Sequence, residues 1–461
     1  MIDENLAFRL ERDQSWDQLH SLALSWPESP QKRWYLGNFL LFGSQDYVQA
    51  IEAYSSLVSS GKCPVEVYLR LGQSLHGADR VNEALACYLR VMVESRGRRD
   101  TWFQHAVYAY GRACLELGLY GHWLDVWSKL QRDHDLLPKG AYLSALAHLS
   151  LTQWSLGWTL YEERCSWFPA SGLQLSIPIW QPGFEADGRS LLISSDMGLG
   201  DFIFFLRFVP ALRVRFSSVF ACVVPALHSI AADSGCFDEV FVEGEPLPQW
   251  WCWHLPITSV AAFLGCVCPE SAALAGYLQV SAAAQSAASH WLRGRSNGRP
   301  LVAINWAGNR SAESPGHTVR GRSLRLAQLE AVKSLKKVDL ISVQQGEDEQ
   351  KRESAVMGWL HPLQHELDSK LGDLLSTAAV LSHCDLLITN DTALAHLGGA
   401  LGIPTWVMLK RHPSWQWGDQ GPSPWYSSVR CFRQRVDFVW DDVLKDVDQA
   451  LEGLIASQRS P

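Results

Sequence analysis

The chain has 461 residues, enough for about three domains of ordinary size. Hydrophobic residues make up 47% and charged residues 19%, proportions that exclude a disordered or highly charged chain. The formal net charge is −8, so the sequence lacks the basic character expected of a general nucleic-acid-binding protein.

Cysteine usage and hydropathy predict a cytoplasmic protein. The 11 cysteines form no CxxC pair and no tetrad with zinc-site spacing, so we expect reduced thiols and no structural zinc. The N-terminus is acidic and lacks the basic and apolar regions of a secretory signal. The most apolar stretch, residues 255–286, contains Pro256, Pro269 and Glu270, which interrupt the ~20 apolar residues that a membrane span needs. We therefore expect no integral membrane segment.

Residues 1–168 are predicted to form tetratricopeptide-like helical repeats. Gly72, Ala84 and Tyr88 have the spacing of small and aromatic residues in such a repeat, and Ala50 and Tyr54 stand 34 residues before the last two. The same offset relates Gly111, Trp123 and Trp127 to Ala145, Gly157 and Tyr161. A small residue on one helix makes room for an aromatic ring on the next. We expect helix pairs at 34–60, 67–95, 107–133 and 141–168, with an insertion near 95–100; the alternative is ordinary helices that match by chance.

The rest of the chain is predicted to be an α/β module in two halves. A linker rich in Pro and Gly occupies 169–188, and beyond it short apolar segments alternate with helical ones, a pattern typical of parallel sheets covered on both faces. The halves are 189–293 and 299–436, followed by a closing helix and tail over 437–461. The expected strands are 191–194, 219–224, 239–242, 301–306, 339–343, 386–389 and 405–409, and the expected helices are 202–216, 326–336, 392–401 and 437–456.

Loops that follow strands are the expected site of chemistry, because parallel sheets bind ligands beyond the carboxyl ends of their strands. After strand 191–194, Gly198 and Gly200 allow close approach of a ligand. Asp201 then stands at the start of the next helix. It is either a helix cap or a general base that takes a proton from an attacking hydroxyl, and the two roles are compatible.

Two further loops have features of an anion site. After strand 301–306, the amides around Gly308 could cradle a phosphate, and Arg320 and Arg322 offer guanidinium groups unless they are solvated surface residues. Asp391 and Thr392 open helix 392–401, where backbone amides, the Thr392 hydroxyl and the helix dipole favour an anion.

His396 and several tryptophans each have two interpretations. His396 lies on the same helical face as Thr392, as a ligand-binding group or as a buried core histidine. Trp415, Trp417 and Trp425 follow the last expected strand, where they stack on a sugar or base or form a hydrophobic plug. Walker A, GxGxxG, GxSxG and HExxH motifs are absent, which removes several common enzyme classes.

A set of motifs in fixed order covers about residues 150–440. It comprises Gly157-Trp158, Tyr161–Arg164, Ile179-Trp180, Gly198–Asp201, Phe205–Phe208, Trp306–Asn309, Arg322-Ser323, Asn390–Ala393 with His396, and Ser423–Tyr426. This set resembles bacterial tetratricopeptide-repeat glycosyltransferases related to family 9, the heptosyltransferase-like group with the GT-B fold.

The resemblance implies helical repeats followed by a GT-B module of two Rossmann-like parallel-sheet halves. It also implies an inverting, metal-independent transfer of a sugar from a nucleotide-activated donor to a hydroxyl, with no other cofactor. Asp201 would be the base, residues 189–293 the acceptor side and 299–436 the nucleotide side. The donor would be held by Gly198, Gly200, Trp306, Gly308, Asn309, Arg322, Gln344, Asp391, Thr392, Ala393 and His396. The acceptor would be a glycan or a protein presented by the repeats.

Some residues depart from the family pattern. Asp196-Met197 stand where the family often has Glu/Gln pairs, Phe204 where it often has Gln, and Gln345 where it often has Lys. Arg320 or Arg322 would then supply the missing cation. These departures motivate an alternative in another class, a non-catalytic interaction protein with repeats and a GT-B module. A further alternative is a protein O-glycosyltransferase similar to the O-GlcNAc transferases, which also join repeats to a GT-B module.

Overall fold

The structure is a computed structural model in which the chain forms two compact units. The first consists of Met1–Ala147 with Ala312–Arg320, and the second of His148–Ser311 with Gly321–Pro461. The described residues are 3–61, 63–95, 101–133, 138–166, 177–248, 251–265, 268–272, 275–295, 297–313, 320–345, 361–362 and 373–458. The domain limits expected from the sequence stay predictions, and the expected insertion near 95–100 lies largely outside the described residues.

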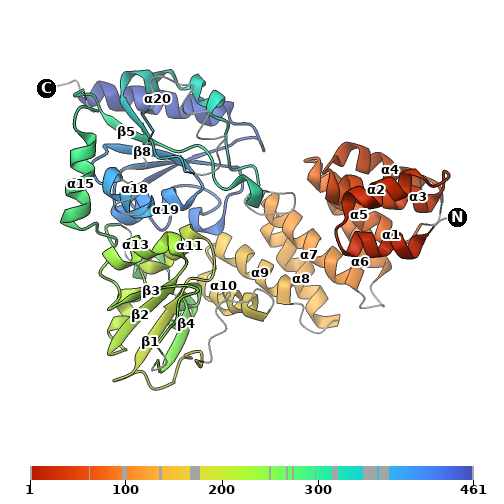
Figure 1. Cartoon of the computed structure of the whole chain (residues 1–461), viewed down its shortest axis with the longest axis horizontal. Coiled ribbons are helices and arrows are strands. Elements are labelled where there is room, and N and C mark those ends of the chain that lie inside the picture. The colour runs from red at the N-terminus through yellow and green to blue at the C-terminus, as the bar shows by residue number, and fades with distance from the viewer. Residues whose placement is uncertain are drawn as a thin grey trace. The chain divides into compact units, whose positions relative to one another are not determined.

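The first unit consists of helices joined by short turns (Figure 1). Its helices are α1 (Glu4–Arg12), α2 (Trp16–Leu24), α3 (Pro30–Asn38), η1 (Phe39–Gly43), α4 (Tyr47–Ser59), α5 (Val65–Gly77), α6 (Val81–Glu94), α7 (Thr101–Glu116), α8 (Tyr120–Asp133) and α9 (Pro138–Ser150), the last of which continues into the second unit. Local signals start several of them. Asp3 accepts from the Leu6 amide at 3.0 Å, and Asp46 accepts from the Gln49 amide at 3.1 Å.

Glycines allow aromatic rings of neighbouring helices to approach closely, as the repeat pattern predicted. A Cβ on Gly72 of α5 would lie 2.6 Å from the Tyr88 ring of α6. A Cβ on Gly111 of α7 would lie 2.9 Å from the Trp123 ring of α8. The helical region is therefore compatible with repeats, each pair burying its core against the next.

The second unit contains two fully parallel sheets. The four-stranded sheet has the order β3-β2-β1-β4 and the six-stranded sheet the order β10-β9-β8-β5-β6-β7. The strands are β1 (Ser190–Ser194), β2 (Ser218–Val223), β3 (Val240–Val242), β4 (Trp253–Pro256), β5 (Leu301–Ile304), β6 (Asp339–Ser342), β7 (His361–Pro362), β8 (Leu386–Asn390), β9 (Thr405–Leu409) and β10 (Val429–Arg433). All seven expected strands are present, while β4, β7 and β10 were not predicted. Two parallel-sheet halves agree with the expected GT-B-like α/β module.

The helices of the second unit are α10 (Trp154–Tyr161), η2 (Glu162–Ser166), α11 (Leu199–Leu206), α12 (Val209–Arg213), α13 (Pro225–Asp233), η3 (Ile257–Ser259), α14 (Val260–Phe263), η4 (Pro269–Ser271), α15 (Ala282–Leu292), η5 (Arg310–Glu313), η6 (Leu326–Ala331), η7 (Lys333–Lys337), α18 (Asp373–Leu381), α19 (Ala393–Leu401), η8 (Trp415–Trp417) and α20 (Asp441–Gln458).

Two helices expected from the sequence are divided. The single helix expected over 202–216 is α11 followed by α12, because Pro210 has no amide hydrogen and is accommodated in the first turn of a new helix. The helix expected over 326–336 is the pair of 3₁₀ segments η6 and η7. Val332 separates them with non-helical backbone angles (φ −86°, ψ 82°) and buries its side chain in the core.

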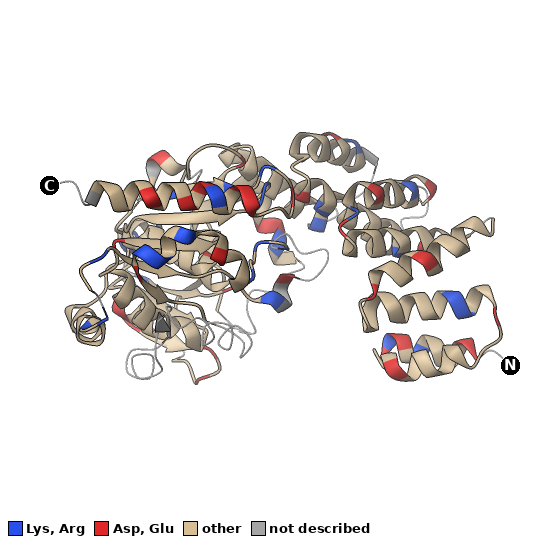
Figure 2. Ribbon diagram, turned by 90° about the horizontal axis from the view of Figure 1, so that it is seen from above, with Lys and Arg blue, Asp and Glu red and all other residues tan. Residues whose placement is uncertain are grey.

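The core of the C-terminal half lies between the six-stranded sheet and α20. Alternate residues of the strands, such as Val302 and Ile304, point to this side and pack with Val443, Val447 and Leu451 of α20. The outward face of α20 carries charged residues (Figure 2), so the predicted amphipathic closing helix is confirmed. Across the described ranges, no helix has both the length and the apolar character needed to cross a bilayer.

Candidate active site

The strand order places the four loops of interest at two switch points. β1 lies between β2 and β4, and β5 lies between β6 and β8. In each sheet, the chain therefore adds strands first on one side of its first strand and then on the other side. Parallel sheets bind ligands beyond the carboxyl ends of the strands at such points. The sequence singled out the loops after β1, β5 and β8 and the segment after β9; it did not single out the loop after β4.

A buried arginine joins the loops after β1 and β4. The Arg164 guanidinium lies 3.2 Å from Asp196 Oδ2 and 2.7 Å from Ser259 Oγ, and it also pairs with Glu162 at 2.6 Å. Thr258 Oγ1 donates to the same Asp196 carboxylate. A buried charge needs such partners, so Asp196 has a structural role at this departure from the family pattern: it is the counter-ion of Arg164.

Asp201 caps its helix, and its role as a base stays a prediction. Its Oδ2 accepts from the Gly198 amide at 3.2 Å, which caps α11, and its Oδ1 accepts from Gln416 Nε2 at 3.1 Å. Burial raises the pKa of this carboxyl to about 6. The Gly198 amide and Arg322 act to lower the pKa, and the carboxylates of Asp196 and Asp391 act to raise it. The residue is partly buried, so its carboxylate loses solvation. It is ionised at neutral pH and able to accept a proton.

The start of α11 packs against the start of α19. A Cβ on Gly200 would lie 2.9 Å from His396 Cδ2 and 3.2 Å from Ala393 Cα. Gly200 therefore acts by lacking a side chain, and Ala393 supplies the surface it packs against. The contact brings the Asp201 loop of one sheet to the first turn of the helix that follows β8 in the other.

Asp391 anchors the segment that carries Gln416. Its Oδ1 accepts from Trp417 Nε1 at 2.7 Å, and its Oδ2 accepts from Ser414 Oγ at 3.0 Å. Because Gln416 lies between these two residues, the anchored segment directs its amide at Asp201. Both oxygens of the Asp391 carboxylate are thus engaged by the protein, so its side chain acts here on the loop.

Arg322 lies against two of the predicted loops. Its Nη1 donates to the Asp391 carbonyl at 2.9 Å, and a Cβ on Gly308 would lie 2.8 Å from its Nη2. The Gly308 amide donates to Ser323 Oγ at 2.9 Å, which fixes the same region. A side chain at Gly308 would displace the guanidinium from this position. Asn309, next along the loop, is exposed.

An amide side chain organises the loop after β5. Gln344 Oε1 accepts from the amides of Trp306 and Ala307 at 3.1 Å and 2.9 Å, and from Asn305 Nδ2 at 2.7 Å. Asn305 Oδ1 in turn accepts from Thr392 Oγ1 at 3.2 Å. Gln344 and the Thr392 hydroxyl therefore stabilise the loop after β5 through hydrogen bonds within the protein. The Trp306 ring is fully buried in the core.

His396 is a buried histidine with protein partners. Its Nδ1 lies 2.9 Å from Tyr426 Oη, and its ring stacks on Trp417 with centroids 4.8 Å apart. Burial lowers the pKa of His396 to about 4. The Asp391 carboxylate acts to raise this pKa, and the positive charges of Arg207 and Arg322 lower it further. The imidazole is neutral at pH 7, as expected for the core interpretation.

The tryptophans after β9 form a hydrophobic cluster. Trp415 and Trp425 pack edge to face on Phe204, with centroids 5.3 Å and 5.2 Å away, and all three are buried. Phe204 therefore extends this cluster, and packing is the role of these rings in the structure.

Gln345, which departs from the family pattern, and Arg320, a candidate for the missing cation, lie in different parts of the structure. Gln345 Nε2 donates to Thr377 Oγ1 at 3.2 Å. Arg320 belongs to the first unit, where it donates to the Gly77 carbonyl at 2.7 Å and pairs with Asp79 at 2.8 Å. Of the two candidate arginines, Arg322 is therefore the one placed beside the Asp201 and Asp391 loops.

Sequence reasoning missed Gln416 and Arg164 as organising residues. Gln416 lies among the tryptophans that follow the last expected strand, and a lone amide among aromatic rings after a strand was the available signal. Arg164 stands in the motif Tyr161–Arg164, but its pairing with Asp196 and Ser259 was not foreseen, since these partners are 32 and 95 residues away in the chain. Among the described residues, no group of three or more His, Cys, Asp and Glu side chains is arranged to hold a metal ion.

Residues 338–436 match the model of Glycosyltransferase family 9 (heptosyltransferase). The matched segment runs from β6 through β10 and includes Asp391, His396 and Gln416. This segment of the chain is therefore similar to the heptosyltransferase-like proteins of glycosyltransferase family 9.

Similarity to individual proteins extends over more of the chain. Protein FlbA from Caulobacter vibrioides is 27% identical over 337 residues, covering 67% of this chain and 54% of FlbA. The chain thus spans about half the length of this curated relative. A glycosyl transferase family 9 structure from Veillonella parvula has 12% identity and a TM-score of 0.43, covering 59% of this chain and 99% of that one. The E. coli ADP-heptose lps heptosyltransferase II has 13% identity and a TM-score of 0.41, covering 59% and 100%.

Proposed function

We propose that this protein transfers a sugar from a nucleotide-activated donor to a hydroxyl group of an acceptor. The reaction inverts the anomeric carbon and needs no metal ion. The family 9 match supports a glycosyltransferase, and the donor class, the inversion and the residue roles below are our proposal.

Asp201 is the general base, and its surroundings are the observation that carries the proposal. A carboxyl with a pKa of about 6 is ionised at neutral pH and is a stronger base than an ordinary aspartate. It takes the proton of the acceptor hydroxyl while that oxygen forms a bond to the anomeric carbon. The bond from this carbon to the diphosphate oxygen breaks in the same step, and the nucleoside diphosphate leaves. A single displacement of this kind inverts the anomeric centre.

The start of α19 and Arg322 stabilise the departing diphosphate. Thr392 precedes α19 with an extended backbone, and its side chain makes no capping hydrogen bond to the first turn. The amides and dipole of that turn therefore favour an anion. Arg322 adds a cation with a planar fork of donors that suits phosphate oxygens. Such groups replace the charge that a metal ion would supply.

The first test measures nucleoside diphosphate release from a panel of nucleotide sugars. Asp201→Asn should reduce release from the donor that the wild type uses by about 10²–10⁴-fold, because the base is lost. Thermal stabilisation by the matching nucleoside diphosphate should persist, because the leaving-group contacts remain. Asp238→Asn is the matched control; it makes the same chemical change on the N-terminal half and should leave release unchanged.

Two outcomes would contradict the proposal. Near-wild-type release by Asp201→Asn would remove Asp201 from the mechanism. Absence of stabilisation by any nucleoside diphosphate or nucleotide sugar would favour the non-catalytic interaction protein.

The metal-independent part of the proposal has its own measurement. Exhaustive treatment with EDTA should leave the release rate within about twofold of the untreated enzyme, since helix amides and Arg322 carry the charge. Loss of activity restored by a divalent cation would overturn this part and leave the role of Asp201 standing.

A further inference from the structure

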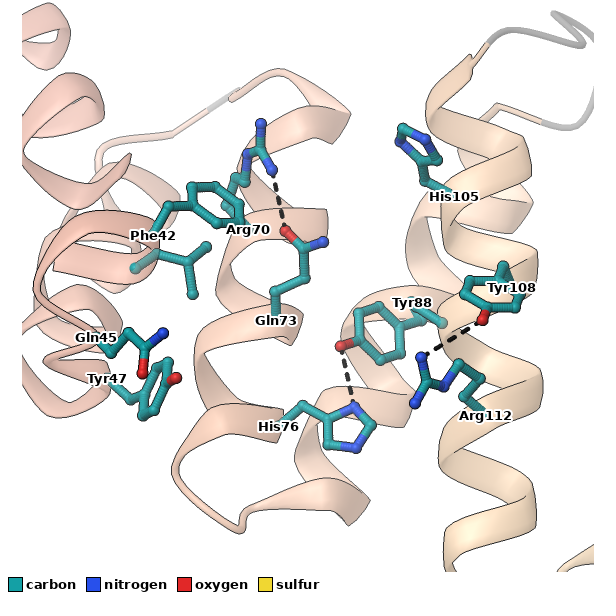
Figure 3. Close-up of a pocket in the computed structure, with 12 residues that line it drawn as sticks. Phe42, Gln45, Tyr47, Arg70, Gln73, His76, Tyr88, His105, Tyr108 and Arg112 are labelled. Carbon is teal, nitrogen blue, oxygen red and sulfur yellow. Dashed lines mark hydrogen bonds between the residues drawn. The ribbon is translucent and has the colours of Figure 1, made fainter. Parts of the chain in front are cut away.

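The first unit contains a cavity of about 360 Å³ that the sugar-transfer proposal does not use (Figure 3). It is lined by residues from η1, α4, α5, α6 and α7, so successive helix pairs contribute to one site. Its volume lies in the range of ordinary ligand sites and fits one or two amino-acid side chains.

The two arginines that line the cavity differ in how they are compensated. Arg70 lies 3.5 Å from Glu11, donates to Gln73 at 3.2 Å and covers the Phe42 ring at 4.6 Å. Arg112 contacts Tyr108, donating to its hydroxyl at 3.4 Å, and has no acidic partner among the described residues. Arg112 therefore brings to the wall a positive charge that forms no ion pair with a described residue, while the Glu116 carboxylate, one turn further along α7, is bound by His76.

Tyr88 and His76 are polar groups beside Arg112, and the cavity lining has no carboxylate that would repel a ligand rich in hydrogen-bond acceptors. Tyr88 Oη lies 3.4 Å from His76 Nδ1, and Figure 3 shows both beside Arg112. His76 Nε2 lies 2.7 Å from Glu116, so the imidazole is held by the protein on its far side. None of the twelve lining residues is Asp or Glu.

The positive charge around the cavity affects the pKa of His105, which lines it. Burial lowers the pKa of His105, and repulsion from Lys139 and Arg70 lowers it further. The positive potential that disfavours a protonated imidazole favours an anion at the same place.

We propose that this cavity binds an acidic residue of a protein chain. Its carboxylate pairs with the Arg112 guanidinium, a geometry in which arginine makes two parallel hydrogen bonds. An adjoining aromatic or aliphatic side chain lies against Phe42 and Tyr47 on the opposite wall (Figure 3). An acidic side chain is favoured over a neutral glycan because the lining includes two arginines and no carboxylate. Binding does not depend on sugar transfer by the second unit.

The test uses the full chain and two fluorescein-labelled peptides in a Gly/Ser background, one with Phe-Glu and one with Phe-Gln. Fluorescence anisotropy should show at least about tenfold tighter binding of the Phe-Glu peptide, since only it carries the carboxylate. Arg112→Gln should abolish that preference. Arg80→Gln should retain it, because Arg80 is an exposed arginine of the same unit, is paired with Glu83 and does not line the cavity.

Arg112→Lys keeps the charge without the planar fork, so it should weaken binding of the Phe-Glu peptide less than Arg112→Gln does. It also decides the question if Arg112→Gln fails to fold in a thermal melt. Equal affinity for the two peptides would overturn the proposal, as would a preference that survives in Arg112→Gln. An oligosaccharide ending in glucuronic acid is the third probe, and tighter binding of it than of the Phe-Glu peptide would overturn the proposal in favour of a glycan. Failure of the sugar-transfer experiment would leave these results unaffected.

Discussion

At the scale of single residues, Asp201 is held in a state that favours chemistry at the expense of stability. Its pKa of about 6 in the folded chain exceeds the ordinary value of 3.8, so ionisation opposes folding. The penalty is absent below pH 3.8 and complete above pH 6. Asp201→Asn should therefore increase the free energy of unfolding by about 1–2 kcal/mol at pH 7.5, after allowance for the partly exposed side chain, and leave it unchanged near pH 3.5.

Denaturant unfolding at the two pH values measures this difference, and Asp238→Asn provides a control of opposite sign. Burial raises the pKa of Asp238, but hydrogen bonds from Arg213 and the Val219 amide outweigh it, so the net pKa is lowered. The stability that Asp238 contributes is present at neutral pH and lost as the pH falls. Its removal should destabilise the chain at pH 7.5. Equal loss of stability in both variants would contradict the pKa raised by burial at Asp201.

At the scale of elements, the contact between α11 and α19 sets the geometry of the candidate site. Gly200→Ala would place a Cβ 2.9 Å from His396 Cδ2 and 3.2 Å from Ala393 Cα, so the helix starts must move apart. Overpacking of this kind costs about 1–3 kcal/mol. We expect Gly200→Ala to lower the unfolding free energy by that amount and to slow nucleoside diphosphate release, because Asp201 moves relative to the start of α19.

Gly453→Ala is the control for this prediction, because a Cβ at Gly453 in α20 would meet nothing within 4 Å. Alanine has the higher helix propensity, so this variant should gain about 0.5–1 kcal/mol. Gly200→Ala with wild-type stability and release would show that the helix starts do not need their close approach.

At the scale of the whole molecule, the two compact units predict separable unfolding. Each has its own core, so calorimetry should resolve two transitions. Gly72→Ala should lower only one of them, because the added Cβ would lie 2.6 Å from Tyr88 in the first unit. Gly200→Ala should lower only the other, and that transition should rise with the nucleoside diphosphate identified by thermal shift. A single transition lowered by both variants would show that the units unfold together.

Local patterns in the sequence predicted much of the fold and part of the site. The alternation of apolar segments predicted β1, β2, β5, β6, β8 and β9, since a buried parallel strand is apolar on both faces. Asp201 and the start of α19 were chosen because they follow strands. β10 and β4 were missed because exposed Arg430 and the aromatic and proline residues around 251–256 hide the strand pattern.

The sequence by itself determined the helix pairs, the alternating strands and the loops in which chemistry should lie, because these depend on residues close together in the chain. Only the tertiary structure decided what each side chain does there. Arg320 and Arg322 are two residues apart and equally charged, yet one holds the end of α5 and the other lies beside Gly308 and Asp391. Gln416 reaches Asp201 across 215 residues of chain. Such partners follow from strand order and packing, where distant segments exclude water and fix one another, and no local pattern records them.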